Sequence, residues 1–170
     1  MSGVGNHLGR RGISMRGSQM VWNTGDLTVP TATTGTDTTP VTTTTYIARV
    51  TIHFNTTVTG LSLLNGSAVA GNVVGILYDH TGVPLAQTAS TAQAGTAAYQ
   101  QVPLTTPYVA IGPGLYFIGW QFNNTGARFR SHALGNFSAF TKTGEAFGAA
   151  TTLTVANTFT ANVGPISSTY

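Results

Sequence analysis

The feature that most constrains the fold is a series of short segments in which apolar and polar residues alternate. The clearest one reads YIARVTIHF from Tyr46 to Phe54. Every second residue in it, starting with Tyr46, is apolar. A period of two is the pattern of a β-strand, because successive side chains point to opposite faces of a sheet. We therefore expect Tyr46, Val50 and Phe54 to lie on one apolar face.

Similar segments follow along the chain, and turn signals separate them. Asn65-Gly66, the run from Asp79 to Gly82 and Gly112-Pro113-Gly114 are turn sequences, and the last predicts a hairpin. No segment carries the start and stop signals of a helix. This order predicts an all-β fold, an antiparallel β-sandwich or jelly roll, with strands over residues 46–54, 57–64, 72–78, 83–88, 99–104, 108–111, 115–122, 129–134 and 151–155.

The N-terminal part of the chain lacks such a pattern. Five glycines precede Ser18, and eleven of the eighteen residues from Thr28 to Thr45 are threonine. A segment without periodic apolar residues forms no core of its own, whereas β-branched threonine favours extended backbone. We expect a basic and then Thr-rich arm over residues 1–40, a sandwich domain over 41–157 and an extended C-terminal tail over 158–170.

Charge is scarce and uneven. Only 6% of the residues are charged, and the formal net charge is +3, whereas about 25% is usual. Arg10, Arg11 and Arg16 supply this excess, since the rest of the chain balances four basic against four acidic residues. Three arginines are too few for a nucleic-acid groove, so we expect the arm to bind an acidic protein surface. Its apolar anchors would be Met20, Val21 and Trp22.

The residues offer little for catalysis or for a cofactor. Cysteine is absent, and the four histidines show no metal-binding spacing. No GxSxG elbow and no phosphate-binding loop occur. A hydrolase would need Asp79 or Glu145 to converge with a histidine. We therefore expect no enzyme activity, no metal and no cofactor.

The sequence also bears on location and on sugar binding. No apolar run is long enough to cross a bilayer, and the N-terminus lacks a secretory signal, so we expect synthesis in the cytoplasm and no membrane partner. Trp120, next to Gln121 and Asn123, is the best candidate for a ring that stacks on a glycan. The alternative interpretation of Trp120 is a core residue, because it shares a strand face with Tyr116.

Two hairpin-like motifs resemble a known group of proteins. They are LYDHTGVPLA at residues 77–86 and PYVAIGPGLYFIG at residues 107–119, within a stretch from Leu61 to Phe122. This stretch resembles a β-sandwich module of tailed-bacteriophage virion proteins, which occurs in capsid decoration (cement) proteins and in tail or fibre proteins. The match is at the level of a fold signature, not of a catalytic motif.

The resemblance implies a structural virion protein. On this hypothesis the chain decorates the exterior of a phage capsid as a homo-oligomer, expected to be a trimer, and stabilises the shell by bridging major capsid subunits. The arm would clamp neighbouring subunits. The alternative is a carbohydrate-binding or receptor-binding module of a tail tip or fibre.

Overall fold

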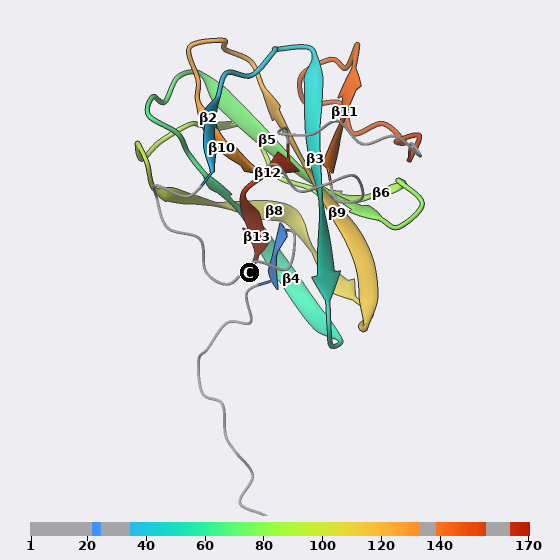
Figure 1. Ribbon diagram of the computed structural model, residues 1–170. Coiled ribbons are helices and arrows are strands. Elements are labelled where there is room, and N and C mark those ends of the chain that lie inside the picture. Colours follow the sequence, from blue (N-terminus) through green and yellow to red (C-terminus); the bar gives the residue numbers. More distant parts are fainter. Residues whose placement is uncertain (1–21, 25–34, 133–138, 156–163) are drawn as a thin grey trace, which may run out of the picture.

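A computed structural model describes residues 22–24, 35–132, 139–155 and 164–170. Its regular elements in this part of the chain are β-strands, without an α-helix, and they pair in antiparallel fashion (Figure 1). The predicted all-β class is confirmed. Two larger sheets and one small sheet surround a common core, as in a sandwich, whereas the jelly-roll order stays a prediction.

The larger sheet has six strands in the order β11-β3-β9-β5-β6, with β7 paired to β5 beside β6. Strands β3 and β9 form its centre, where Tyr46 is opposite Trp120 and Val50 is opposite Tyr116. The turn from Asp79 to Gly82 joins β5 to β6, as the sequence predicts. The strands are β3 (Thr44–Ile52), β5 (Asn72–Asp79), β6 (Pro84–Gln87), β7 (Thr91–Ala92), β9 (Gly114–Phe122) and β11 (Ala139–Thr143).

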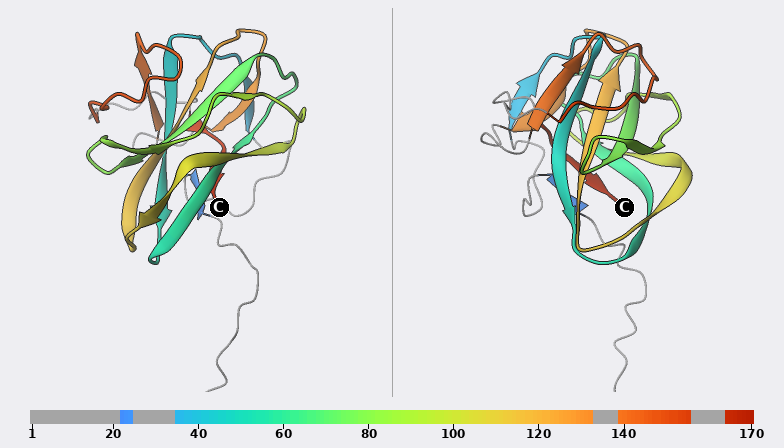
Figure 2. Two further views of the ribbon diagram at one scale, coloured as in Figure 1. Left: turned by 180° about the vertical axis from the view of Figure 1, so that it is seen from behind. Right: turned by 90° about the vertical axis from the view of Figure 1, so that its right-hand side faces the viewer.

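The opposing sheet has four strands in the order β1-β13-β4-β8, and a three-stranded sheet, β12-β10-β2, closes one side. Figure 2 shows these layers from two further directions. The four-stranded sheet consists of β1 (Trp22–Asn23), β4 (Thr56–Leu64), β8 (Tyr99–Ala110) and β13 (Ser167–Thr169). The small sheet consists of β2 (Thr36–Thr38), β10 (Phe129–His132) and β12 (Gly164–Pro165).

The main core lies between the sheets and follows from the alternation in β3 and β9. Tyr46, Val50 and Ile52 of β3 meet Ile118 and Trp120 of β9 there, and each is buried. Residues of opposite parity, including Ile47, Tyr78 and Phe117, face outward from the six-stranded sheet. With Phe140 of β11 they form a second apolar cluster, which residues 144–155 cover through Leu153. The six-stranded sheet is therefore covered on both faces.

Three local predictions were wrong. Gly112-Pro113-Gly114 is not a hairpin, because β8 pairs with β4 whereas β9 pairs with β3 and β5, so this turn carries the chain between sheets. The two strands predicted over 99–104 and 108–111 are one strand, β8, which tolerates Pro103 and Pro107 because it lies at the end of its sheet order. Residues 151–155 form no strand.

The described part of the predicted tail belongs to the sandwich. Strand β13 lies between β1 and β4, and residues 166–169 are buried. The Tyr170 carbonyl accepts hydrogen bonds from the backbone N–H groups of Thr59 (2.7 Å) and Gly60 (3.1 Å). A Cβ atom at Gly60 would lie 2.1 Å from the Tyr170 ring, so only glycine leaves room for this ring. Strand β2, from the predicted arm, likewise pairs with β10.

Strand β13 also provides the hydrogen-bond acceptor for Trp120, the largest fully buried side chain in the described part of the chain. Trp120 is fully buried, and its Nε1–H donates to Ser167 Oγ at 2.9 Å. Ser167 Oγ in turn donates to the Ser62 carbonyl on β4 at 2.5 Å. Thr24, which follows β1, accepts from Ser167 N (3.1 Å) and donates to the Pro165 carbonyl (2.8 Å). A chain of buried hydrogen bonds therefore joins β9, β13, β4 and the residue after β1.

We predict that Trp120 and Ser167 are energetically coupled. Ser167→Ala should lower the free energy of unfolding by about 1–3 kcal/mol, because the buried indole N–H loses its acceptor. In a Trp120→Phe background, which lacks that N–H, the same substitution should cost about 1 kcal/mol less. Urea unfolding of the two single variants and the double variant measures this coupling. Ser90→Ala, at an exposed serine, is the matched control, and strictly additive losses would contradict the account.

Candidate docking surface

The predicted arm residues lie mostly outside the described part of the chain. This holds for Arg10, Arg11, Arg16, Met20 and Val21. For Trp22 the backbone is described, and it pairs with Thr169 in β13. The role of these six residues in binding a partner therefore stays a prediction.

Trp120 is a core residue and not a glycan-stacking platform. Its side chain is 0% exposed, and its only polar atom is hydrogen-bonded inside the sandwich. A sugar stacks on the open face of a ring, and no face of this indole reaches solvent. The structure thus corrects the first of the two interpretations of Trp120. The second, based on the face it shares with Tyr116, is confirmed, since both belong to the main core.

Large apolar side chains are exposed instead at one end of the sandwich. Phe54 (59% exposed), Val109 (65%), Ile111 (71%) and Leu115 (39%) surround the two turns that cross between the sheets there. One turn joins β3 to β4 and the other joins β8 to β9, at the lower end of the molecule in Figure 1. We call these four residues the apolar tip.

Short-range contacts hold the apolar tip in one shape. Gly112 N donates to Asn55 Oδ1 at 2.9 Å, which ties the two turns together. A Cβ atom at Gly112 would lie 2.5 Å from backbone atoms of Phe54, so glycine allows the turns to approach this closely. The Tyr116 hydroxyl accepts from Ile111 N and donates to the Ile111 carbonyl, both at 3.0 Å. The exposed side chains thus project from a backbone that is already positioned for binding.

The apolar tip is also free of charge. Residues 51–57 and 107–116, which form both turns and the adjoining strand ends, contain no Asp, Glu, Lys or Arg. Depletion of charge together with aromatic and aliphatic side chains is typical of the buried centre of a protein interface. Large exposed apolar side chains that gather at one end of a domain mark a contact site.

The apolar tip is not apparent from the sequence, because the alternating pattern continues beyond the end of β3. The alternating pattern placed Phe54 on the core face with Tyr46 and Val50, but β3 ends at Ile52. The chain then turns toward the other sheet, and the Phe54 ring is left beyond the end of the core. Asn55, which directly follows Phe54, is a residue type that favours turns, and it indicates that the strand ends before this point.

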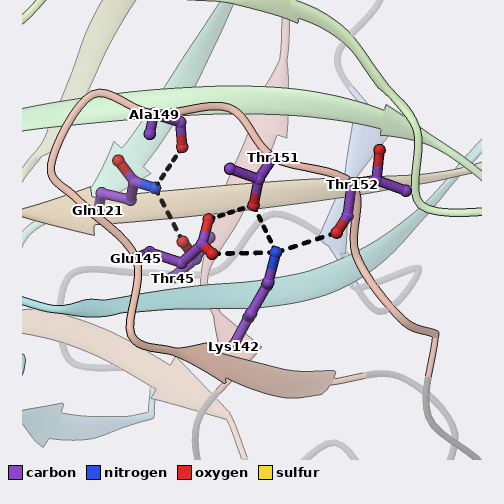
Figure 3. Close-up of polar contacts among 7 residues, drawn as sticks. All are labelled: Thr45, Gln121, Lys142, Glu145, Ala149, Thr151 and Thr152. Atoms are coloured by element: carbon purple, nitrogen blue, oxygen red, sulfur yellow. Dashed lines mark hydrogen bonds and ion pairs between the residues drawn. The ribbon is translucent and has the colours of Figure 1, made fainter.

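A second cluster, on the outer side of the six-stranded sheet, combines charged and polar side chains (Figure 3). Lys142 Nζ lies 2.9 Å from Glu145 Oε1, and Glu145 is only 6% exposed. Thr151 Oγ1 donates to Glu145 Oε2 at 2.6 Å, and Lys142 Nζ donates to the Thr152 carbonyl at 3.0 Å. These contacts close residues 142–152 into a loop over the sheet.

The amide of Gln121 fastens the same loop to β9 and β3. Its Nε2 donates to Thr45 Oγ1 and to the Ala149 carbonyl, each at 2.9 Å, while its Oε1 accepts from Gly148 N at 2.8 Å. Beneath the loop, burial and then the negative charge of Glu145 raise the pKa of Tyr78 far above its ordinary value. Tyr78 is therefore neutral at physiological pH, and we interpret the cluster as a structural clamp.

The carboxylate of Asp79 also holds a turn. Asp79 Oδ1 accepts from Thr81 N (2.8 Å) and Val83 N (2.9 Å) in the β5–β6 turn. Burial alone would raise the pKa of Asp79, but these hydrogen bonds outweigh it and lower the pKa. Over the described ranges no three His, Cys, Asp or Glu side chains gather as metal ligands. The same ranges contain no helix long and apolar enough to cross a membrane.

Comparison with protein-family models, with curated protein sequences and with solved structures finds no match for this chain. The fold defines the class of this protein as an all-β sandwich, with an apolar tip at one end.

We predict that the clamp depends on Lys142 more than on Glu145. Lys142→Met leaves a buried carboxylate without its cation and should lower the free energy of unfolding by about 1–3 kcal/mol. Glu145→Gln should cost less, because Lys142 is 30% exposed and can turn toward water. The double variant should recover part of the Lys142→Met loss. Urea unfolding of the three variants tests this order, and a larger loss for Glu145→Gln than for Lys142→Met would disprove it.

Proposed function

We propose that the chain is a structural virion protein that decorates the exterior of a tailed-phage capsid and stabilises it by bridging major capsid subunits. The observation that carries the proposal is the apolar tip, a rigid and uncharged docking surface on a domain with few charges of its own. The motifs at residues 77–86 and 107–119 support a virion context. A homo-oligomer, expected to be a trimer, belongs to the same proposal.

The size of the apolar tip indicates that it does not act alone. At the exposures given above, its four side chains offer an apolar area on the order of 400 Å². A stable protein interface buries about 800 Å² on each partner. The tip therefore supplies roughly half of what a stable attachment needs. The basic N-terminal segment, with Arg10, Arg11 and Arg16, is the part of the chain that we propose supplies the rest.

The strand register supports a shared partner for the two contacts. Trp22 is level with Thr169 and Leu61, whereas Asn23 is level with Ser168 and Ser62. Strand β4 begins at Thr56, next to the apolar tip. The N-terminal end of β1 therefore points toward the tip end of the sandwich. A partner that covers the tip would therefore lie at the end of the domain toward which the arm leads. On this proposal the arm extends from there to a neighbouring subunit.

The alternative function, a carbohydrate-binding module of a tail tip or fibre, gains a different candidate residue. Phe54 has an exposed ring, and it lies between His53 and Asn55, which carry polar groups. We keep this alternative because an exposed ring beside amide and imidazole groups is the arrangement that sugar stacking needs.

We predict that polar substitutions in the apolar tip weaken attachment without unfolding the domain. Phe54→Ser and Ile111→Ser each remove an apolar contact of about 1.5–3 kcal/mol, which corresponds to a loss of affinity of roughly tenfold or more. Co-sedimentation with heads that lack the protein, from the phage that encodes it, measures this loss. Val41→Ser is the matched control, since Val41 is 54% exposed but precedes the opposite end of β3.

The same series separates the two functions. Equal occupancy of heads by Phe54→Ser, Ile111→Ser and wild type would remove the proposed docking role of the tip. Loss of binding on a glycan array in Phe54→Ser alone, with no other change in that variant or in Ile111→Ser, would support the carbohydrate-binding alternative instead.

We further predict that deletion of residues 2–21 leaves a folded domain with reduced attachment to heads. The deletion stops before Trp22 because β1 pairs with β13 and Thr24 is hydrogen-bonded in the core. Thermal unfolding should therefore stay close to that of the full chain. Wild-type occupancy of heads by the truncated chain would show that the arm makes no contact that matters.

A further inference from the structure

Asn65-Gly66 is the only Asn-Gly pair in the sequence, and it lies at the end of β4. Asn-Gly is a turn signal, but Asn65 is 0% exposed and bridges to Phe129 in β10. A fully buried asparagine in this dipeptide is chemically notable. Its side-chain amide is a potential electrophile, and the N–H of a following glycine is the least hindered nucleophile that a peptide chain offers.

The side chain of Asn65 is held by a cluster of buried amides. Its Nδ2 donates to the Ala94 carbonyl (2.6 Å) and to Gln100 Oε1 (3.2 Å). Its Oδ1 accepts from Gln93 Nε2 at 2.8 Å. Gln93 Nε2 also donates to the Arg128 carbonyl at 2.9 Å. Residues 93–100 are thereby fastened to the end of β4, and every polar atom of the Asn65 side chain has a partner.

Gly66 is fastened as well. Its N–H donates to the Arg128 carbonyl at 2.9 Å, and its carbonyl accepts from Ala97 N at 2.8 Å. A Cβ atom at this position would lie 2.7 Å from the Cβ atom of Arg128, which is fixed to its backbone, and 2.0 Å from Asp37 Oδ1. Packing therefore requires glycine after Asn65, which makes the reactive dipeptide a consequence of the fold.

We propose that Asn65-Gly66 is a deamidation site that the native fold suppresses and that opening of residues 93–100 releases. In the reaction the Gly66 nitrogen attacks Asn65 Cγ, the N–Cγ bond forms, and the Cγ–Nδ2 bond breaks. The proton of the attacking nitrogen leaves with the amide group as ammonia. Water then opens the cyclic imide at either carbonyl, which yields aspartate or isoaspartate at position 65.

The native contacts oppose each step. The Gly66 N–H is engaged with Arg128, so its nitrogen is not available to attack Asn65 Cγ. The leaving amide is held by two acceptors, and it would have to abandon both. The product would place a carboxylate against the Ala94 carbonyl and Gln100 Oε1, two acceptors that repel it. Deamidation in an opened molecule therefore prevents the native cluster from forming again.

Peptide mapping by mass spectrometry, applied to the full chain, tests the proposal. The chain is kept in mildly alkaline buffer, folded in one sample and in guanidinium chloride in the other, and the conversion of amide to acid at Asn65 is followed with time. The folded chain should react at least about 100-fold more slowly, because only opened molecules react. Equal rates in the two samples, or no conversion of Asn65 in denaturant, would overturn the proposal.

Two variants locate the cause. Gly66→Ala, measured in denaturant, should slow the reaction, because a methyl group hinders the attacking nitrogen. Gln93→Ala removes the donor to Asn65 Oδ1 and should raise the rate in buffer while tryptophan fluorescence shows that the domain stays folded. An unchanged rate in folded Gln93→Ala would show that the amide cluster does not protect Asn65.

Discussion

The sandwich depends on one buried polar contact, the hydrogen bond from the Trp120 indole to Ser167. A tryptophan in the centre of a core fills a large volume, but its N–H must find an acceptor that is also inside the protein. Here the acceptor belongs to β13, which comes from the far end of the chain. Once β13 is in place between β1 and β4, it supplies the edge on which β1 pairs, and the position at which the N-terminal segment joins the domain follows from it.

The same two-layer construction explains why the apolar tip stays exposed. At that end both turns, after β3 and after β8, carry the chain from one sheet to the other, so their residues lie across the end of the core. Phe54 and Ile111 therefore cannot turn inward, and Gly112 and Asn55 hold them in place. An apolar surface that the fold cannot bury, and whose two turns contain no charged residue, is best explained by a partner, which is why we place attachment at this end.

Much of the fold was predictable from local sequence pattern. The strands β3, β5 and β9 and the β5–β6 turn follow from it, because each strand is a short segment rich in apolar residues with turn residues at its ends. Trp120 could be interpreted in two ways, since alternation does not distinguish a buried ring from an exposed one. Strand β13 was not predictable, because it carries no apolar pattern and its two serines are buried with hydrogen bonds to residues far away in the sequence. Phe54 was misplaced for a related reason, since the end of a strand depends on where the chain must cross to the other sheet.

Hydrogen–deuterium exchange of the full chain, free and bound to capsids, tests the central claim most directly. The account predicts that binding slows exchange in the two turns of the apolar tip, residues 53–57 and 107–115, because a partner then excludes water from their exposed backbone. Residues 36–44, toward the opposite end of β3, should exchange at the same rate in both states. Protection confined to residues 36–44, with unchanged exchange at the apolar tip, would contradict the claim that this end of the sandwich is the docking surface.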